Sequence, residues 1–332
     1  MLMLFVAFLT AFAIGILISP LVIKLAKKAK AGQTILHYVE AHKQKDGTPT
    51  LGGVIFLVAS LSFLFFQNGS SSLALVALGI FFAYGILGFL DDFIKIKTHK
   101  NLGLKPYQKI IGQAGIAALV AVFVWKNAFL GGQMYLPWGL CEVNISWWII
   151  PLTIVAFLAM TNSANLTDGL DGLAGGVSFV AILALSGICM ITFSSVSEMG
   201  ANLAYQQELK NLAMLAVCVA GGILAFLCFN SYPAKIFMGD TGSLALGGVL
   251  CAIASFCGEL LVLPLICITF VLSAVSDIIQ VVYYKKTKKR VFLMAPLHHH
   301  FEKKGVNECK IVVIYIITTI IASGGAIALC LL

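Results

Sequence analysis

The stretch LALVALGIFFAYGILGFL, from Leu73 to Leu90, decides the fold class, and Asp91-Asp92 follow it directly. It carries no charge, and its length is close to the roughly 20 apolar residues that an α-helix needs to cross a bilayer. Backbone amides cannot stay unpaired in lipid, and the run lacks the alternation of a β-barrel strand. We therefore predict a membrane-spanning helix that ends in two adjacent carboxylates.

The rest of the chain repeats this pattern. Of the 332 residues, 60% are hydrophobic and only 11% are charged, which lies far outside the range of soluble domains. We predict an all-α polytopic membrane protein with about ten transmembrane helices, built as one integral-membrane domain over residues 1–332. The predicted spans are residues 2–23, 51–66, 73–90, 110–125, 147–160, 173–193, 212–229, 244–257, 260–284 and 311–331.

Basic residues orient these spans. All but two of the 22 lysines and arginines fall on the face reached after odd-numbered spans, and only Lys126 and Lys210 fall on the other face. Because positive residues concentrate on the cytoplasmic side, both termini are predicted to be non-cytoplasmic.

The residue types that can take part in catalysis or metal binding lie on the same inner face. All six histidines and every aspartate except Asp277 fall there, which predicts a catalytic cleft facing the cytoplasm. Asp277 lies inside the ninth predicted span. It marks either a break in that helix or a polar packing contact, and an acid within a membrane is a functional hypothesis by default.

The sharpest inner motif is the Asp91-Asp92 pair with Lys95 one helical turn away. Two adjacent carboxylates at the edge of a low-dielectric region repel each other, which indicates a metal or a general base. The alternative is a helix end whose acids simply pair with Lys95.

The preceding inner loop ends in Lys45-Asp46-Gly47 and Gly52-Gly53. Its backbone either approaches a phosphate closely or forms a tight entry turn with a snorkelling lysine.

Two further inner segments carry amides and acids. Asn162, Asn165, Asp168 and Asp171 recur every three residues, so on a helix or tight turn they form one polar stripe beside glycines such as Gly169. Amides and carboxylates can bind a nucleobase edge, a ribose or hydrated Mg²⁺.

The segment that leads into the eighth span adds Lys235, Phe237 and Asp240. Together they offer a phosphate contact, a stacking surface and a metal ligand. The alternative is that Asp240 or Thr241 is only a helix N-cap.

The last inner loop carries a basic run from Lys285 to Arg290 and the internal triplet His298-His299-His300. Three consecutive histidines cannot all face one metal from a regular element, so we interpret them as phosphate donors or a proton shuttle rather than a zinc site. The basic run alone is typical of an anchor for anionic lipid.

These loops contain no good Ser-His-Asp or Cys-His arrangement, which favours metal-assisted phosphoryl transfer over acyl transfer. Two other classes of protein are alternative interpretations of this sequence. A proton- or cation-coupled transporter requires ionisable residues along the midplane, where only Asp277 lies. A lipid-binding scaffold explains the basic loops but leaves the carboxylate clusters unexplained.

The chain resembles a known family over essentially its whole length. The resemblance rests on Asp91-Asp92, the segment 162–176, the segment 237–243 and the segment 296–302. These motifs are similar to those of the polyprenyl-phosphate N-acetylhexosamine-1-phosphate transferases. The His298–His300 triplet, flanked by Pro296 and Glu302, resembles the muramoyl-pentapeptide branch of this family.

This resemblance implies a reaction and its participants. Undecaprenyl phosphate would attack UDP-N-acetylmuramoyl-pentapeptide with Mg²⁺ as cofactor, giving lipid I and UMP in a bacterial plasma membrane. The implied partners are these two substrates and the lipid bilayer, with no nucleic acid, and a homodimer is left open. The implied groove for the polyprenyl chain is bounded partly by the ninth span.

The resemblance also implies residue roles. Asp240 is the expected Mg²⁺ ligand, and Asp91 the expected activator of the lipid phosphate, supported by Asp92. The remaining expected catalytic residues are His298, His299 and His300. The expected substrate-binding residues are Lys45, Lys95, Lys109, Asn162, Asn165, Asp168, Gly169, Leu170, Asp171 and Phe237.

Overall fold

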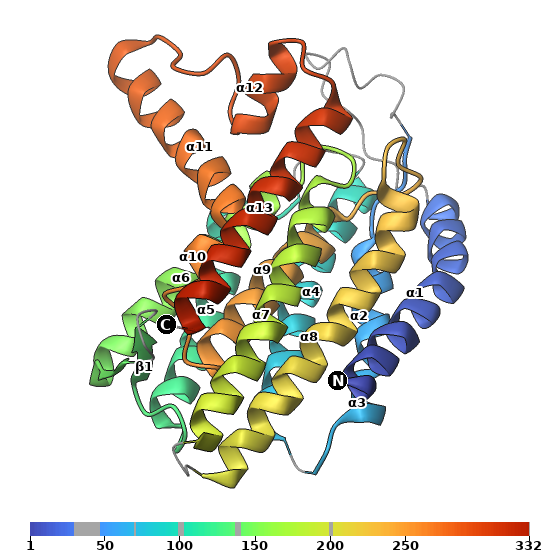
Figure 1. Cartoon of the computed structure of the whole chain (residues 1–332). Coiled ribbons are helices and arrows are strands. Elements are labelled where there is room, and N and C mark those ends of the chain that lie inside the picture. Colours follow the sequence, from blue (N-terminus) through green and yellow to red (C-terminus); the bar gives the residue numbers. More distant parts are fainter. Residues whose placement is uncertain (30–46, 70, 99–102, 137–140, 199–201, 332) are drawn as a thin grey trace.

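The computed structural model describes residues 1–29, 47–69, 71–98, 103–136, 141–198 and 202–331. In this part of the chain the protein is a bundle of helices with one two-stranded hairpin (Figure 1). Both chain ends lie away from the end of the bundle that carries α12 (Leu297–Lys303), which is the predicted inner end (Figure 1).

Nine helices of the described chain are long and apolar enough to cross a membrane, which confirms a polytopic all-helical membrane protein. They are α1 (Leu2–Lys28), α4 (Ser72–Thr98), α5 (Pro106–Lys126), α6 (Ile149–Thr167), α7 (Leu173–Glu198), α8 (Leu203–Asn230), α9 (Gly239–Phe256), α11 (Ile268–Thr287) and α13 (Glu308–Leu331).

The predicted second span is helical from Gly53 to Phe66, with a tighter 3₁₀-like turn at Leu61 and Ser62. It consists of α2 (Gly53–Ser60) and α3 (Phe63–Phe66), which together are shorter than the nine long helices. The Ser60 hydroxyl donates to the Leu57 carbonyl at 2.7 Å, and the amides of Leu61 and Ser62 make tight i→i−3 bonds. Side-chain hydroxyls that compete for helix carbonyls in this way favour a local tightening of this kind.

The predicted ninth span is broken near its outer end. A short α10 (Leu263–Ile266) precedes α11, and Cys267 between them has non-helical dihedral angles. Pro264 lies in the first turn of α10, where its missing amide is tolerated. Beyond Cys267, α11 is continuous through Asp277, so the interpretation of Asp277 as a helix break is wrong.

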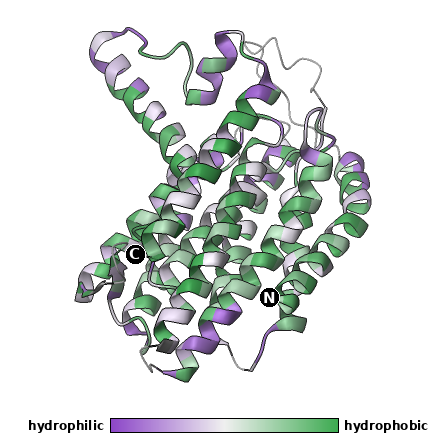
Figure 2. Cartoon of the chain, in the orientation of Figure 1, coloured by the Kyte–Doolittle hydropathy of each residue, from purple (hydrophilic) through white to green (hydrophobic). Residues whose placement is uncertain are grey.

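The centre of the bundle is α9, and the membrane-facing surface belongs to the outer helices. The apolar window of α9 is 89% buried, whereas that of α1 is 22% buried. Small residues of α9 allow this packing, since Gly247 touches the α6 backbone and Gly248 touches Tyr84 of α4. Figure 2 shows an apolar band around the bundle with hydrophilic residues at both ends, as a bilayer requires.

The hairpin lies at the outer end of the bundle, opposite α12 (Figure 1). Its strands β1 (Gln133–Leu136) and β2 (Cys141–Asn144) are antiparallel, with Gln133 opposite Asn144. A 3₁₀ turn, η2 (Ser146–Trp148), leads from the hairpin into α6 and stacks Trp147 on Trp148 at 4.3 Å. Exposed tryptophans are typical of a membrane–water interface.

Candidate active site

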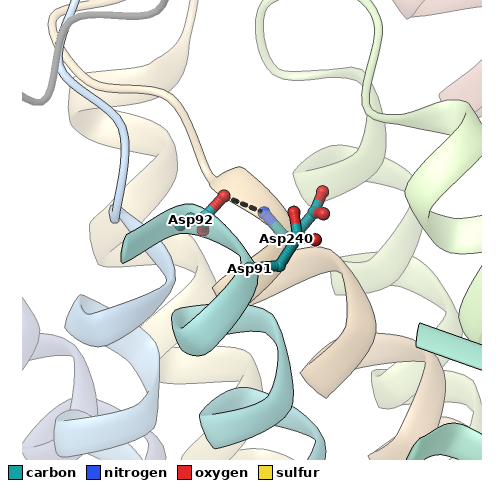
Figure 3. A group of neighbouring side chains, drawn as sticks. All are labelled: Asp91, Asp92 and Asp240. Carbon is teal, nitrogen blue, oxygen red and sulfur yellow. Dashed lines mark hydrogen bonds between the residues drawn. The ribbon is translucent and has the colours of Figure 1, made fainter. Parts of the chain in front are cut away.

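Three aspartates from two helices meet at the inner end of the bundle. Asp91 and Asp92 lie in α4, which continues to Thr98, and Asp240 lies in the first turn of α9. Each offers a carboxylate oxygen within 4.8 Å of the others. Figure 3 shows the three side chains together at the ends of the two helices. The helices approach this closely because a Cβ at Gly88 would overlap the backbone of Asp240. Packing of α4 on α9 therefore builds an acidic cluster that could hold a metal ion.

Asp92 acts on the start of α9. Its carboxylate accepts hydrogen bonds from the amide of Asp240 at 3.2 Å, the amide of Thr241 at 2.9 Å and the hydroxyl of Thr241 at 2.7 Å. These amides belong to the helix N-terminus, where orphan donors and the helix dipole favour a negative charge. The alternative that Asp240 or Thr241 is only the N-cap of this helix is therefore wrong. The carboxylate that accepts from the first amides belongs to Asp92 of α4.

Asp91 has different partners and lies beside Asp240 and Lys95. Its Oδ1 accepts from the amide of Leu104 at 2.8 Å, and its Oδ2 lies 2.6 Å from the Lys95 ammonium. The side chain is buried. The two adjacent acids thus have different hydrogen-bond partners, although the Lys95 ammonium also lies 3.6 Å from Asp92.

Two lysines neutralise Asp240. Lys95 of α4 and Lys109 of α5 place their ammonium groups 3.0 and 2.8 Å from the same oxygen, Oδ2. The Asp240 side chain is 14% exposed, so it is screened from bulk water while still open to the site. With every group ionised, three carboxylates and two ammonium groups leave one excess negative charge, which a bound cation would balance.

Asn165 completes the surroundings of Asp240. Its amide donates to Asp240 Oδ1 at 2.7 Å and to the Ser243 hydroxyl at 2.8 Å, and its oxygen accepts from Lys109 at 3.3 Å. Ser243 is a site residue that the sequence reasoning missed. It lies three residues after Asp240 on α9, and that helical spacing could have identified it.

Asn162 lies one helical turn deeper in the membrane and has different partners. Its amide donates to Gln113 of α5 at 2.8 Å and to the Leu158 carbonyl at 2.8 Å. The structure therefore places Asn162 in the α5–α6 contact rather than among the residues around Asp240.

The predicted polar stripe changes from helix to turn at Thr167, where α6 ends. Asp168 begins the turn, and its carboxylate forms no hydrogen bond with any described residue. Burial raises the pKa of Asp168 to about 8, and the nearby charges of Asp240 and Asp92 raise it further in the same direction. Leu170 is buried in the hydrophobic core, so its side chain packs rather than faces the site.

Asn230, at the end of α8, ties this turn to the loop before α9. Its oxygen accepts from the amide of Gly172 at 3.0 Å, and its amide donates to the Ile236 carbonyl at 2.9 Å. Asp171 reinforces the same connection by accepting from the amide of Ala234 at 2.9 Å. Asn230 is a second residue that the sequence reasoning missed as a positioning group, because its partner Gly172 is far away along the chain.

Phe237 is half-buried and is positioned by backbone pairing. Its amide donates to the Pro49 carbonyl and its carbonyl accepts from the Gly52 amide, both at 2.8 Å. This pairing joins the glycine-containing entry segment to the loop before α9. Lys45 lies outside the described residues.

The three histidines of α12 have three different environments. His298 is fully buried beside Gly169, where a Cβ would overlap its ring, and neither ring nitrogen has a hydrogen-bond partner among the described residues. Burial lowers the pKa of His298 to about 3, with a further lowering by His299. The Nδ1 of His299 lies 2.8 Å from Glu302, and that of His300 accepts from the Leu293 amide at 3.1 Å.

The three histidines thus contact different segments of the chain. His298 and His299 lie against Gly169 in the turn that Asp168 begins, whereas His300 holds the segment that precedes α12. Asp277 is separate from these groups and makes no hydrogen bond or ion pair with any described residue, so the polar-contact interpretation gains no support.

Comparison with known proteins gives full-length relatives. The model of glycosyl transferase family 4 matches residues 73–258. The phospho-N-acetylmuramoyl-pentapeptide-transferase of Clostridioides difficile (strain 630) is 40% identical over 314 residues, covering 94% of this chain and 93% of the relative. Proteins of the same name from Desulfitobacterium hafniense and Clostridium novyi are also 40% identical, each covering 94% of this chain and 92% of the relative.

The family match includes both halves of the acidic cluster, Asp91-Asp92 and Asp240, and the relatives extend over nearly the whole bundle. The chain belongs to the phospho-N-acetylmuramoyl-pentapeptide-transferases of glycosyl transferase family 4.

Proposed function

We propose that this protein transfers phospho-N-acetylmuramoyl-pentapeptide from its UDP conjugate to undecaprenyl phosphate. The products are lipid I and UMP, and the reaction is the first membrane step of peptidoglycan synthesis. The observation that carries the proposal is the buried acidic cluster with Lys95 and Lys109 at the inner end of a membrane bundle. The enzyme would work in the bacterial plasma membrane, with its site facing the cytoplasm.

The donor set of the site fits Mg²⁺. This ion prefers oxygen ligands and is usually held by one or two carboxylates together with substrate phosphates. Asp240, the ligand expected from the sequence, would hold it, and Asp91 and Asp92 offer the neighbouring carboxylate oxygens. When bound, Mg²⁺ supplies neutralisation of the diphosphate charge.

The protein's own residues overcome the repulsion between two polyanionic substrates. Undecaprenyl phosphate is already an anion near neutral pH, so alignment and charge neutralisation matter more than deprotonation. Lys95, Lys109 and Lys45 are proposed to bind phosphate oxygens. Asp91 lies where it can receive the remaining proton of the lipid phosphate.

The nucleotide side is proposed to be the turn after α6. With a pKa of about 8, Asp168 keeps its proton near neutral pH, so its hydroxyl can donate to a uracil or diphosphate oxygen. Phe237 offers a ring for stacking on the base. His299, oriented by Glu302, is available for a phosphate or sugar oxygen, while neutral His298 supports the turn at Gly169.

One assay tests the function as a whole. Purified protein in detergent should release UMP from UDP-N-acetylmuramoyl-pentapeptide only when Mg²⁺ and undecaprenyl phosphate are both present, and should release little from UDP-N-acetylglucosamine. Lys95→Ala should reduce the rate by about 100-fold or more, because it removes a charge that contacts Asp240.

The matched control is Lys97→Ala, which removes an exposed lysine from the same helix and should leave the rate unchanged. UMP release without the lipid acceptor, or equal use of both nucleotide sugars, would overturn the proposed reaction.

A further inference from the structure

The inner end of α11 leaves the bundle and is exposed on every side. Each residue from Val281 to Arg290 is exposed, so no face of this segment packs on the described part of the protein. Figure 1 shows α11 leaning outward, away from the other helices and toward the inner end.

The helix from Ile278 to Tyr284 is apolar around its circumference except at Gln280. Ile278 is 62% exposed, and Val281 to Tyr284 are exposed at every consecutive position. A helix that is apolar all round requires an apolar environment, which here is the hydrocarbon of the inner leaflet. Tyr283 and Tyr284 come last, and tyrosine is enriched at the depth where hydrocarbon meets headgroups.

Positive charge follows within the next turn. Five basic residues, all exposed, occupy the next six positions, and none of them forms an ion pair with a described residue. They are Lys285, Lys286, Lys288, Lys289 and Arg290. With a rise of about 1.5 Å per helical residue, the first of them lies at the level of the lipid phosphates once the tyrosines lie at the interface.

The basic segment is held in place by the arm that follows it. Gln280 accepts from the amides of Val291 and Phe292 at 3.1 and 3.0 Å and donates to the Phe292 carbonyl at 3.3 Å. Arg290 donates to the Leu293 carbonyl at 3.2 Å. The chain therefore turns back at a fixed place, and the lysines stay at one depth instead of trailing into the cytoplasm.

We propose that residues 285–290 form a binding site for the headgroups of anionic bilayer phospholipids in the inner leaflet. The apolar, tyrosine-ended helix sets the depth, and the unpaired lysines supply charge complementary to phosphodiesters. Each basic residue near an anionic membrane surface contributes about 1 kcal/mol. The site is separate from the acidic cluster and is filled by the surrounding bilayer, whether or not the proposed reaction takes place.

The test measures lipid binding rather than turnover. Full-length protein is placed in nanodiscs of phosphatidylcholine with a small fraction of fluorescent phosphatidylglycerol, and energy transfer from a label near the segment reports local enrichment. Replacing Lys285, Lys286 and Lys289 together with glutamine should lower the apparent affinity for phosphatidylglycerol by about 5-fold per charge, or about 100-fold in total. Arginine at the same three positions should keep the affinity.

The matched control is the triple variant Lys24→Gln, Lys27→Gln, Lys28→Gln, read with the same label. It removes three exposed charges from the inner end of α1, where the helix packs on the bundle, and should leave the enrichment at α11 intact. Thermal unfolding of all variants checks that they are folded.

Two outcomes would overturn the site: enrichment unchanged in the glutamine variant of α11, or an equal loss in the α1 variant. Displacement of the lipid signal by inorganic phosphate or by undecaprenyl phosphate at low occupancy would instead identify a phosphate or polyprenyl site, and would equally reject bulk phospholipid as the occupant.

Discussion

At the scale of single residues, Asp91 and Asp92 show how neighbouring side chains with the same chemistry acquire different tasks. Successive residues of a helix point about 100° apart, so one carboxylate faces the start of α9 and the other faces Lys95 and the Leu104 amide. A carboxylate that accepts three hydrogen bonds from a helix start is a structural group, while one beside a lysine is available for chemistry.

This difference predicts opposite phenotypes for two conservative variants. Asp92→Asn removes the charge at the α9 terminus and should lower stability by about 1–2 kcal/mol as well as turnover. Asp91→Asn should reduce UMP release strongly while leaving the thermal unfolding temperature within a few degrees. Unfolding scans and turnover of both proteins check this, and identical behaviour of the two variants would contradict the division of roles.

Asp168 predicts a pH dependence of nucleotide binding. Because its folded pKa is raised to about 8, its proton is bound near neutral pH and is lost as the pH rises through about 8. The KM for the nucleotide sugar should therefore rise over this range. Asp168→Asn, which always offers a donor, should flatten the profile. A wild-type KM that stays constant from pH 7 to 9 would rule out Asp168 as the donor.

At the scale of elements, the α4–α9 pair carries the site. Gly88 lets the α4 backbone approach the start of α9 closely enough for Asp92 to reach the Thr241 amide. At the outer end, Glu208 of α8 similarly holds the start of α4, accepting from the amides of Ser72 and Leu73 at 2.7 and 3.0 Å. Buried acids on neighbouring helices thus fix two helix starts in the bundle.

Glycine substitutions within α4 test this packing. Gly88→Ala would overlap the Asp240 backbone, so α9 must shift, and we expect at least a 10-fold loss of turnover together with a lower unfolding temperature. Gly79→Ala is the control on the same helix, because nothing lies within 4 Å of its new Cβ. It should be neutral or slightly stabilising, by up to about 1 kcal/mol. Equal effects of the two variants would show that the close approach does not matter.

At the scale of the whole molecule, the buried acid Glu259 differs from Asp92 and Glu208, which both accept hydrogen bonds from helix amides. The inner end surrounds its aspartates with lysines and helix amides. At the outer end, Glu259 is fully buried with Cys330 as its side-chain contact at 3.9 Å, and its Oε1 has no partner among the described residues. Burial therefore raises the pKa of Glu259 to about 7.

Glu259 makes the stability of the fold depend on pH. The folded state holds the proton up to about pH 7, whereas the unfolded chain releases it near 4.5. The contribution of Glu259 to the free energy of unfolding is fully present below pH 4.5. It is lost progressively as the pH rises to about 7, by on the order of 3 kcal/mol in total. Glu259→Gln should remove this slope in unfolding measurements between pH 5 and 7.5. A wild-type slope that persists in the variant would assign it to another group.

The sequence by itself determined the membrane class, and it predicted the membrane face of the site and its candidate residues. Span length follows from bilayer thickness, and orientation follows from the distribution of lysines, so neither needs tertiary contacts. Asp91-Asp92 and Asp240 were identifiable because acids are costly at a membrane boundary.

Only the tertiary structure decided which of these residues act together. Asp91 and Asp92 have different hydrogen-bond partners in the structure, and Asn162 lies in the contact between two helices. Leu170 is buried in the core. Ser243 and Asn230 contact the site or position its loops, although the sequence did not predict them. The tertiary structure also divided the histidine triplet among three environments. The physical reason is that hydrogen-bond partners such as Asp92 and Thr241 lie far apart along the chain, and helix packing alone brings them within reach.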